Sequence, residues 1–168
     1  MAETSDLVQR LRAARAAFGD LRPGIESGEP WPLSADFGTA PESSWGPREA
    51  LAHVAEMLPY WTGEIARVVV AGAPELVLFG RVQSDVLRIG ILERDRTLPL
   101  GELFERIDAG TDRIARRLQA LSGAEAARRG VHPRLGELAA AEMAERFVVG
   151  HLEEHVEQLR DLVAARRG

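Results

Sequence analysis

Three histidines are the side chains of this 168-residue chain whose types and spacing best suit chemistry. His151 and His155 are four residues apart in an apolar stripe, so on a helix they project within roughly 40° of each other and can reach one ion. His53 lies on the border of a second apolar face. Because burying three imidazoles without a shared partner is costly, this pattern predicts one divalent metal ion held by His53, His151 and His155.

Each of these histidines also has a simpler interpretation. Ordinary hydrogen bonds explain many buried histidine pairs, and His53 alone could be a hydrogen-bonded residue at the edge of a core. The fourth histidine, His132, precedes Pro133 in a turn, where we expect a loop role and no metal ligation. Gln158 lies close to the face of His155 and could orient a ligand, but a helix-packing amide is the interpretation we favour.

Carboxylates close to the histidines are candidates for an acid or a base. They would serve only if they entered the site, and we expect them to be solvated surface groups. They are Glu56, Glu64 and Glu154.

A three-histidine site would leave the ion reactive. Neutral imidazoles leave its +2 charge uncompensated and at least one coordination position open, as expected of a catalytic site and not of a structural one. Such an ion acidifies bound water or holds a bound thiol as the thiolate. The chain has no cysteine, so thiol chemistry would need an external thiol.

Long helices must position these residues. Apolar residues at spacings of three and four predict helices over about 5–22, 47–70 and 100–121, and from Gly136 almost to the C-terminus. Pro23-Gly24 is expected to end the first helix, and Pro59 to kink the second. With no convincing strand, the pattern predicts an all-α, four-helix, antiparallel-capable bundle in a single domain over residues 1–168.

Two long connections, residues 23–44 and 72–99, join the first three helices. The first is rich in proline and glycine, and the second is expected to contain one short helix. Variable loops over a rigid scaffold commonly tune selectivity, so these connections are the candidates for the mouth of a substrate site.

Charge and hydropathy exclude some functions. The formal net charge of −5 repels phosphate backbones, which argues against a nucleic-acid partner. The longest apolar run, residues 68–73, is too short to span a bilayer, and the N-terminus is polar. We therefore expect a cytoplasmic protein without a membrane partner.

Three motifs together resemble the DinB/YfiT-like superfamily of metal-dependent enzymes over nearly the whole chain. They are Trp45-x-Pro47-x-Glu49-x-x-x-His53, His132-Pro133-x-x-Gly136 and His151-x-x-x-His155-x-x-Gln158-Leu159.

The resemblance implies a particular fold and activity. The fold would be a four-helix up-and-down bundle, often a homodimer, with a three-histidine site for zinc, nickel or a similar ion. The activity would be transfer of a low-molecular-weight thiol such as bacillithiol, mycothiol or glutathione to a small electrophilic substrate, or a thiol-dependent isomerisation.

Other functions compete with this one. The same open metal suits a hydrolase, and the bundle cavity suits a non-catalytic sensor or small-ligand binding module. Residues 151–155 also fit the H-x-x-E-H pattern of inverted zinc peptidases, but only 13 residues follow His155, too few for their further ligand. A ferritin-like di-iron site needs Glu-x-x-His pairs, and Val148 and Leu152 occupy the positions of the glutamates.

Overall fold

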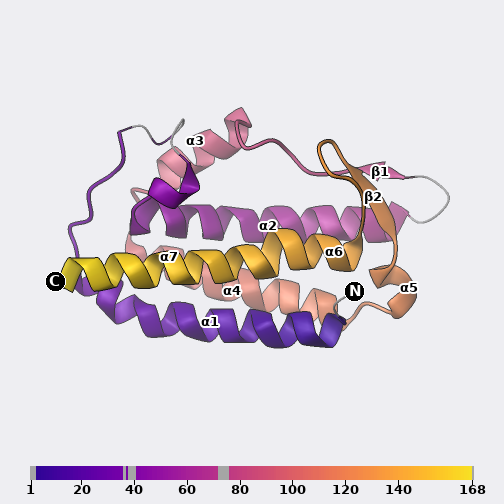
Figure 1. Cartoon of the computed structure of the whole chain (residues 1–168), viewed down its shortest axis with the longest axis horizontal. Coiled ribbons are helices and arrows are strands. Elements are labelled where there is room, and N and C mark those ends of the chain that lie inside the picture. The colour runs from indigo at the N-terminus through magenta and orange to yellow at the C-terminus, as the bar shows by residue number, and fades with distance from the viewer. Residues whose placement is uncertain (1–2, 36, 38–40, 72–75, 168) are drawn as a thin grey trace.

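Most of the chain is helical. The structure is a computed structural model that describes residues 3–35, 37, 41–71 and 76–167. Its long helical segments lie side by side (Figure 1). These segments are α1 (Thr4–Ser27), α2 (Pro47–Ala71), α4 (Leu100–Gln119) and a C-terminal run of α6 (Ala140–Ala144), the π-helical turn η2 (Glu145–Val149) and α7 (Gly150–Arg167).

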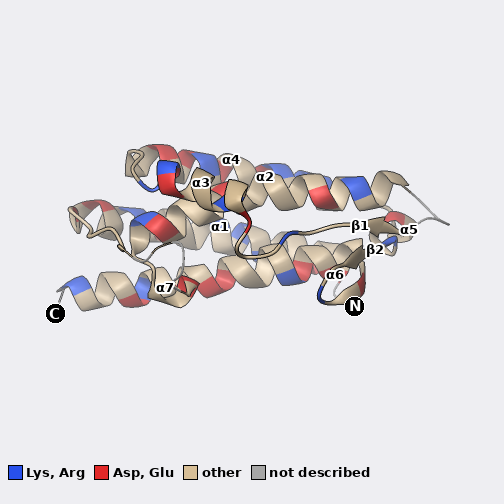
Figure 2. Ribbon diagram, turned by 90° about the horizontal axis from the view of Figure 1, so that it is seen from above, with Lys and Arg blue, Asp and Glu red and all other residues tan. Residues whose placement is uncertain are grey.

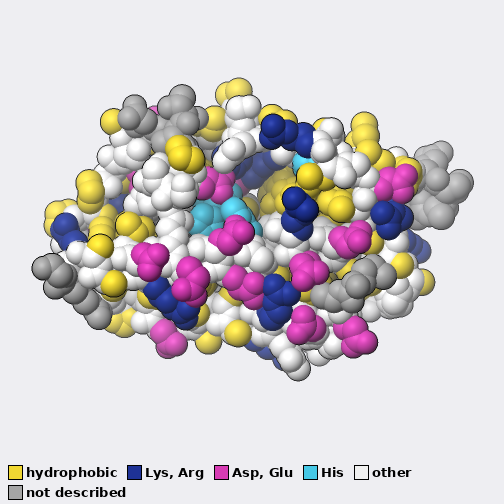
Figure 3. All heavy atoms as spheres, in the orientation of Figure 1, with side chains coloured by type: hydrophobic (Ala, Val, Ile, Leu, Met, Phe, Trp, Pro, Cys, Tyr) yellow, Lys and Arg dark blue, Asp and Glu magenta, His cyan; other side chains and the backbone are white. Residues whose placement is uncertain are grey.

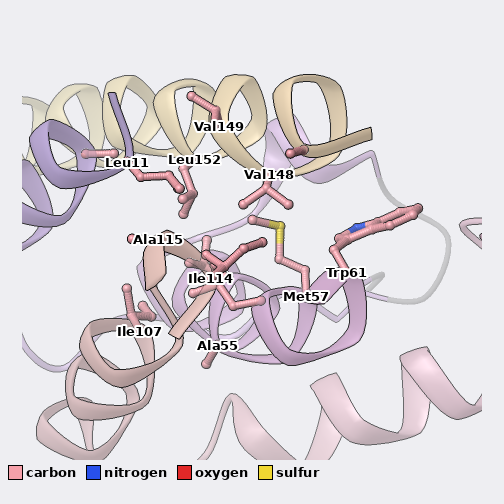
Figure 4. Packing of buried hydrophobic residues seen from close by; sticks show 14 of the residues in the cluster. Leu11, Ala55, Met57, Trp61, Ile107, Ile114, Ala115, Val148, Val149 and Leu152 are labelled. Carbon is pink, nitrogen blue, oxygen red and sulfur yellow. The ribbon is translucent and has the colours of Figure 1, made fainter. Parts of the chain in front are cut away.

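The core lies between these helices, where their apolar faces meet. α1 and α2 each contact both α4 and α7. Met57, Ile114, Val148 and Leu152 point toward one another in this core and are fully or almost fully buried (Figure 4). Each lies in the apolar stripe of its own helix, so burial of these stripes is what fixes which face each helix turns inward.

The first helix is longer than the sequence predicted. α1 continues past Pro23 to Ser27, so the expected end at residue 22 is wrong. Pro23 cannot donate to the carbonyl of Gly19, but Gly19 is exposed and water can satisfy that group. The extra turn buries Ile25 completely, and the Ile25 carbonyl accepts a 2.8 Å hydrogen bond from the Trp31 indole nitrogen.

A small sheet corrects the expectation of no strands. It has the order β1-β2-β3, with β1 (Val77–Leu78) parallel to β2 (Arg129–His132), and β2 antiparallel to β3 (Gly136–Ala139).

The last helical segment therefore begins at Ala140 and not at Gly136. Gly136 has φ +74°, a left-handed conformation that suits the turn between β2 and β3 and not a helix start. In β2, a Cβ on Gly130 would lie 2.7 Å from Phe79 and 2.8 Å from Val68. Gly130 therefore lets the sheet pack closely against the end of α2.

The two long connections carry short elements. The first holds the 3₁₀ turn η1 (Glu42–Ser44), and the second holds β1 and the one short helix predicted there, α3 (Val86–Asp95). The Asp85 side chain accepts a 2.9 Å hydrogen bond from the Arg88 backbone and so caps the start of α3. Parts of both connections, residues 36, 38–40 and 72–75, lie outside the described residues.

The remaining helices agree closely with the sequence. α2 and α4 end within two residues of the predicted bounds, and the short α5 (Gly123–Ala126) follows α4. α2 contains Pro59 without a break in the helix. Among the described residues, no helix is both long enough and apolar enough to cross a membrane.

Candidate metal centre

Three separate segments bring four potential ligands together. η1 contributes Glu42, the second turn of α2 contributes His53, and the start of α7 contributes His151 and His155. One ligand atom from each side chain lies within 4.8 Å of the others. The structure thus brings the three sequence-predicted histidines into one cluster and adds Glu42, which the sequence interpretation missed.

The spacing of these atoms suits one small ion. The Nε2 atom of His151 lies 2.9 Å from that of His53 and 3.3 Å from that of His155. Glu42 Oε2 lies 3.2 Å from His151 Nε2, 3.7 Å from His53 Nε2 and 4.0 Å from His155 Nε2. A tetrahedral zinc ion with bonds of about 2.05 Å needs ligand atoms about 3.3 Å apart, and the distances of 2.9–4.0 Å lie on both sides of this value.

Two histidines have their other ring nitrogen held by an acceptor. Gln158 Oε1 lies 2.9 Å from His155 Nδ1, and Glu154 Oε2 lies 3.0 Å from His151 Nδ1. Each acceptor receives a hydrogen bond from Nδ1–H, so each ring, when neutral, has its Nε2 lone pair directed at the centre of the cluster. This tautomer is the one that a metal ion requires at Nε2.

Gln158 also ties the cluster to the loop before α2. Its amide nitrogen donates to the backbone carbonyls of Glu42, at 2.8 Å, and Trp45, at 3.1 Å. These two acceptors fix the orientation of the amide, so its oxygen must face His155. Gln158 is therefore a positioning group for the cluster, a role that the sequence interpretation ranked second to helix packing.

His53 has different surroundings. A guanidinium nitrogen of Arg88 lies 3.3 Å from His53 Nδ1, and Arg88 also pairs with Glu42 and donates to the Gln83 carbonyl at 3.0 Å. When Arg88 donates to Nδ1, the proton of neutral His53 resides on Nε2, from which it can be donated to His151. Metal binding at His53 Nε2 would displace that proton.

The electrostatics favour a deprotonated ligand set. Burial holds the pKa of His53 well below its usual value and lowers that of His155 to about 4. Burial would raise the pKa of Glu42, but the hydrogen bond from His151 and the nearby positive charges lower it. Burial also lowers the pKa of His151, but hydrogen bonds to Glu42 and Glu154 outweigh it and the net shift is upward. Metal ligation needs neutral imidazoles and an ionised carboxylate, which three of these four groups already supply near neutral pH.

The other candidates from the sequence lie elsewhere. Glu56 is buried in an ion pair with Arg81, and Glu64 accepts a 2.6 Å hydrogen bond from the Gly80 backbone, so the expectation of solvated surface groups is wrong for both. Glu154 is largely exposed, although it contacts His151. His132 is buried at the end of β2, outside the four-residue cluster.

A cavity of about 280 Å³ opens beside the cluster. Glu42, His53 and His151 line it together with Trp61 of α2 and residues of the 81–88 segment, the β2–β3 hairpin and η2. Figure 3 shows the histidines at the edge of this hollow. Both connections expected to form the substrate mouth therefore contribute to its lining.

Glu42 carried no local signal in the sequence. It lies 11 residues before His53 in a proline- and serine-rich segment that has no helical periodicity. Its position depends on tertiary contacts with Arg88 and Gln158, which come from distant parts of the chain. Only the folded geometry identifies it.

Comparison with known proteins identifies the family of the chain. A search of curated proteins found no match. The profile of the DinB superfamily matches residues 2–159, which include all four members of the cluster and Gln158. The chain therefore belongs to the DinB superfamily.

Proposed function

We propose that this protein is a divalent-metal-dependent enzyme whose ion is held by His53, His151 and His155, with Glu42 as a fourth, displaceable ligand. The observation that carries the proposal is the convergence of three Nε2 atoms, two of them on rings whose Nδ1 is held by an acceptor. Hydrogen-bonded core histidines would not need this common focus. We also infer that α1, α2, α4 and the C-terminal run form the up-and-down bundle that the resemblance implies.

The donor set fits zinc or nickel best. Imidazole nitrogen suits both ions, and a single carboxylate is too few hard oxygen donors for calcium or magnesium. When bound, such an ion lowers the pKa of a thiol or water molecule that joins it.

Other residues of the site would assist ligand exchange, proton transfer and the exclusion of water. Arg88 pairs with Glu42 and so weakens it as a ligand, which would ease its displacement by substrate. Once displaced, Glu42 Oε2 remains within reach to take a proton from an incoming nucleophile. Trp61 and Phe147, whose rings stack 4.2 Å apart, line the cavity and would exclude water from one side of the substrate.

We propose transfer of an external low-molecular-weight thiol to an electrophile, or a thiol-dependent isomerisation, as the reaction. The absence of cysteine agrees with an external thiol. Hydrolysis is the second candidate, because the carboxylate of Glu42 beside the three imidazoles suits a base for water as well as for a thiol.

Metal content is the first test. Inductively coupled plasma mass spectrometry should find about one equivalent of zinc or nickel in the wild type, lost in His53→Ala and in His151→Ala. The matched control is His132→Ala, which removes a histidine outside the cluster and should keep the metal. A wild type that stays metal-free after incubation with zinc and nickel would leave only the non-catalytic binding module.

The reaction is tested on the metal-loaded protein. Bacillithiol, mycothiol and glutathione are each supplied with 1-chloro-2,4-dinitrobenzene, and 4-nitrophenyl acetate is supplied without thiol. If the reaction is thiol transfer, the wild type should turn over 1-chloro-2,4-dinitrobenzene with at least one thiol. This turnover should be lost in His151→Ala. Turnover of the ester alone would favour the hydrolase, and thiol transfer that survives His151→Ala would exclude the proposed site as its origin.

A further inference from the structure

The cavity beside the histidines has an excess of positively charged residues in its lining. Four arginines and one carboxylate, Glu42, line it. Two of the arginines are neutralised, since Arg88 pairs with Glu42, and Arg81 pairs with Glu56. The other two, Arg134 and Arg146, form no ion pair or side-chain hydrogen bond with any residue that the structure describes.

His132 adds a hydrogen-bond donor to the cavity that these arginines line. Its Nδ1 accepts from the Arg134 backbone at 3.3 Å, so the proton of the neutral ring is on Nε2. Nε2 has no hydrogen-bond partner among the described residues, although His132 is only 6% exposed and lines the cavity. Burial lowers the pKa of His132, and the charges of Arg134 and Arg146 lower it further.

From this arrangement we infer that Arg134, Arg146 and His132 form an anion-binding subsite, and that the substrate carries a carboxylate or a phosphate group at the end remote from the metal ligands. Guanidinium groups recognise both anions through charge-assisted hydrogen bonds. That the bound anion belongs to a substrate rests on the proposed function, but anion binding itself does not.

Three aromatic rings that line the cavity suggest the chemistry of the substrate between its anionic group and its electrophilic centre. The His132 ring stacks on Phe147 with centroids 5.3 Å apart, and Phe147 stacks on Trp61 at 4.2 Å. Rings in such a stack offer their edges to the cavity, and aromatic edges favour contact with the face of an aromatic or unsaturated body. The substrate class is therefore a small unsaturated or aromatic acid, or the corresponding phosphate, with its electrophilic centre toward His53 and His151.

Figure 3 shows the same division of the hollow. A large group of histidine atoms lies at one edge, and arginine side chains with a smaller histidine patch border the opposite side. Every cationic side chain of this protein apart from histidine is arginine, because the sequence has no lysine. Charge-neutralising substitutions at this subsite are therefore all Arg→Gln.

Binding is tested without metal, in the full-length His151→Ala variant. This background removes a metal ligand and the one clustered histidine whose pKa is raised, so anion binding there cannot come from the ion or from that imidazolium. The probes are benzoate, phenylphosphonate and the neutral benzamide, and their affinities are measured by isothermal titration calorimetry at low salt. The control is Arg12→Gln, which removes an exposed arginine of α1 that does not line the cavity.

At least one anionic probe should bind roughly tenfold or more tightly than benzamide, and Arg134→Gln and Arg146→Gln should each remove most of that preference. A preference for benzoate would identify the anion as a carboxylate, and one for phenylphosphonate as a phosphate. Equal affinity for all three probes, or a preference that survives the double variant, would overturn the subsite. If the wild type instead proves unable to bind metal while this preference holds, the metal-dependent function fails and the anion subsite stands.

Discussion

At the scale of single residues, Gln158 connects two parts of the site that the sequence keeps far apart. It accepts from His155 Nδ1 and donates to the backbone carbonyl of Glu42, 116 residues away. We expect Gln158→Leu to lower zinc affinity by about 10- to 100-fold, because groups that orient a ligand histidine commonly have effects of this size. A competition titration against a chromophoric chelator measures it.

The control for this prediction is Gln9→Leu. It removes an exposed glutamine of α1 and should leave zinc affinity unchanged. Unaltered affinity in Gln158→Leu, with the fold intact by circular dichroism, would show that Gln158 only packs against the helix.

His132 should make the stability of the metal-free protein depend on pH. Its pKa in the folded state is lowered by burial and by Arg134 and Arg146. The unfolded chain therefore takes up the proton first as pH falls, so the stability that the neutral ring contributes is fully present above about pH 6.5 and is lost as pH falls through the folded pKa. His53 and His155 titrate in the same direction, so only a comparison with a variant isolates His132.

His132→Phe supplies that comparison because it keeps an aromatic ring against Phe147. Urea unfolding at pH 7.5, 6.5 and 5.5 should show a smaller loss of the free energy of unfolding in the variant. One proton accounts for at most about 1.4 kcal/mol per pH unit. Parallel curves for the two proteins would mean that the pKa of His132 is not lowered by folding.

At the scale of secondary structure, periodicity in the sequence predicted the long helices well. Apolar residues at helical spacing mark α2 and α4 because packing against the core selects those positions. The β2–β3 hairpin was missed because its two strands are only four residues each, too short for a clear alternating pattern. The histidine ligands could be predicted because two share a helical face, whereas Glu42 depends on contacts between distant segments.

The π-helical turn η2 was also not predicted from the sequence. It lies directly before α7, where Val148 and Val149 are both fully buried. A π turn adds one residue to a helical turn, and such turns occur frequently at functional sites. The inserted residue changes the direction of the helical faces, so Arg146 and Phe147 line the cavity while His151 and His155 face the cluster.

Alanine substitutions at two glycines should change the stability of the protein in opposite directions. A Cβ on Gly130 would meet Phe79, Val68 and the Val77 carbonyl at 2.7–2.9 Å, so Gly130→Ala should lower the free energy of unfolding by about 1–3 kcal/mol. Gly63 lies inside α2 with nothing within 4 Å of an added Cβ, so Gly63→Ala should raise it by up to about 1 kcal/mol. Urea denaturation measures both. Equal tolerance of the two alanines would contradict the close packing of the sheet on α2.

At the scale of the whole molecule, charge does not divide the surface into faces of one sign. Acidic and basic residues are interspersed along the helices (Figure 2). Several of these charges join different helices, as when Arg10 of α1 pairs with Glu153 of α7 at 2.8 Å. Arg134 and Arg146, which form no ion pair with the residues that the structure describes, are therefore a local feature of the cavity and not part of a general basic surface.

The candidate metal centre joins segments that are distant in the chain, so a bound ion should stabilise the whole fold. His53 and His151 are 98 residues apart, and Glu42 adds the loop before α2. An ion that binds only the folded state adds about 2.7 kcal/mol when its free concentration is 100 times the dissociation constant. For a chain of this size each kcal/mol raises the Tm by about 2–4 °C, so zinc should raise the Tm by about 5–11 °C. Differential scanning calorimetry should show this rise in the wild type and in His132→Ala, but not in His53→Ala, and an equal rise in His53→Ala would place the bound zinc outside the proposed centre.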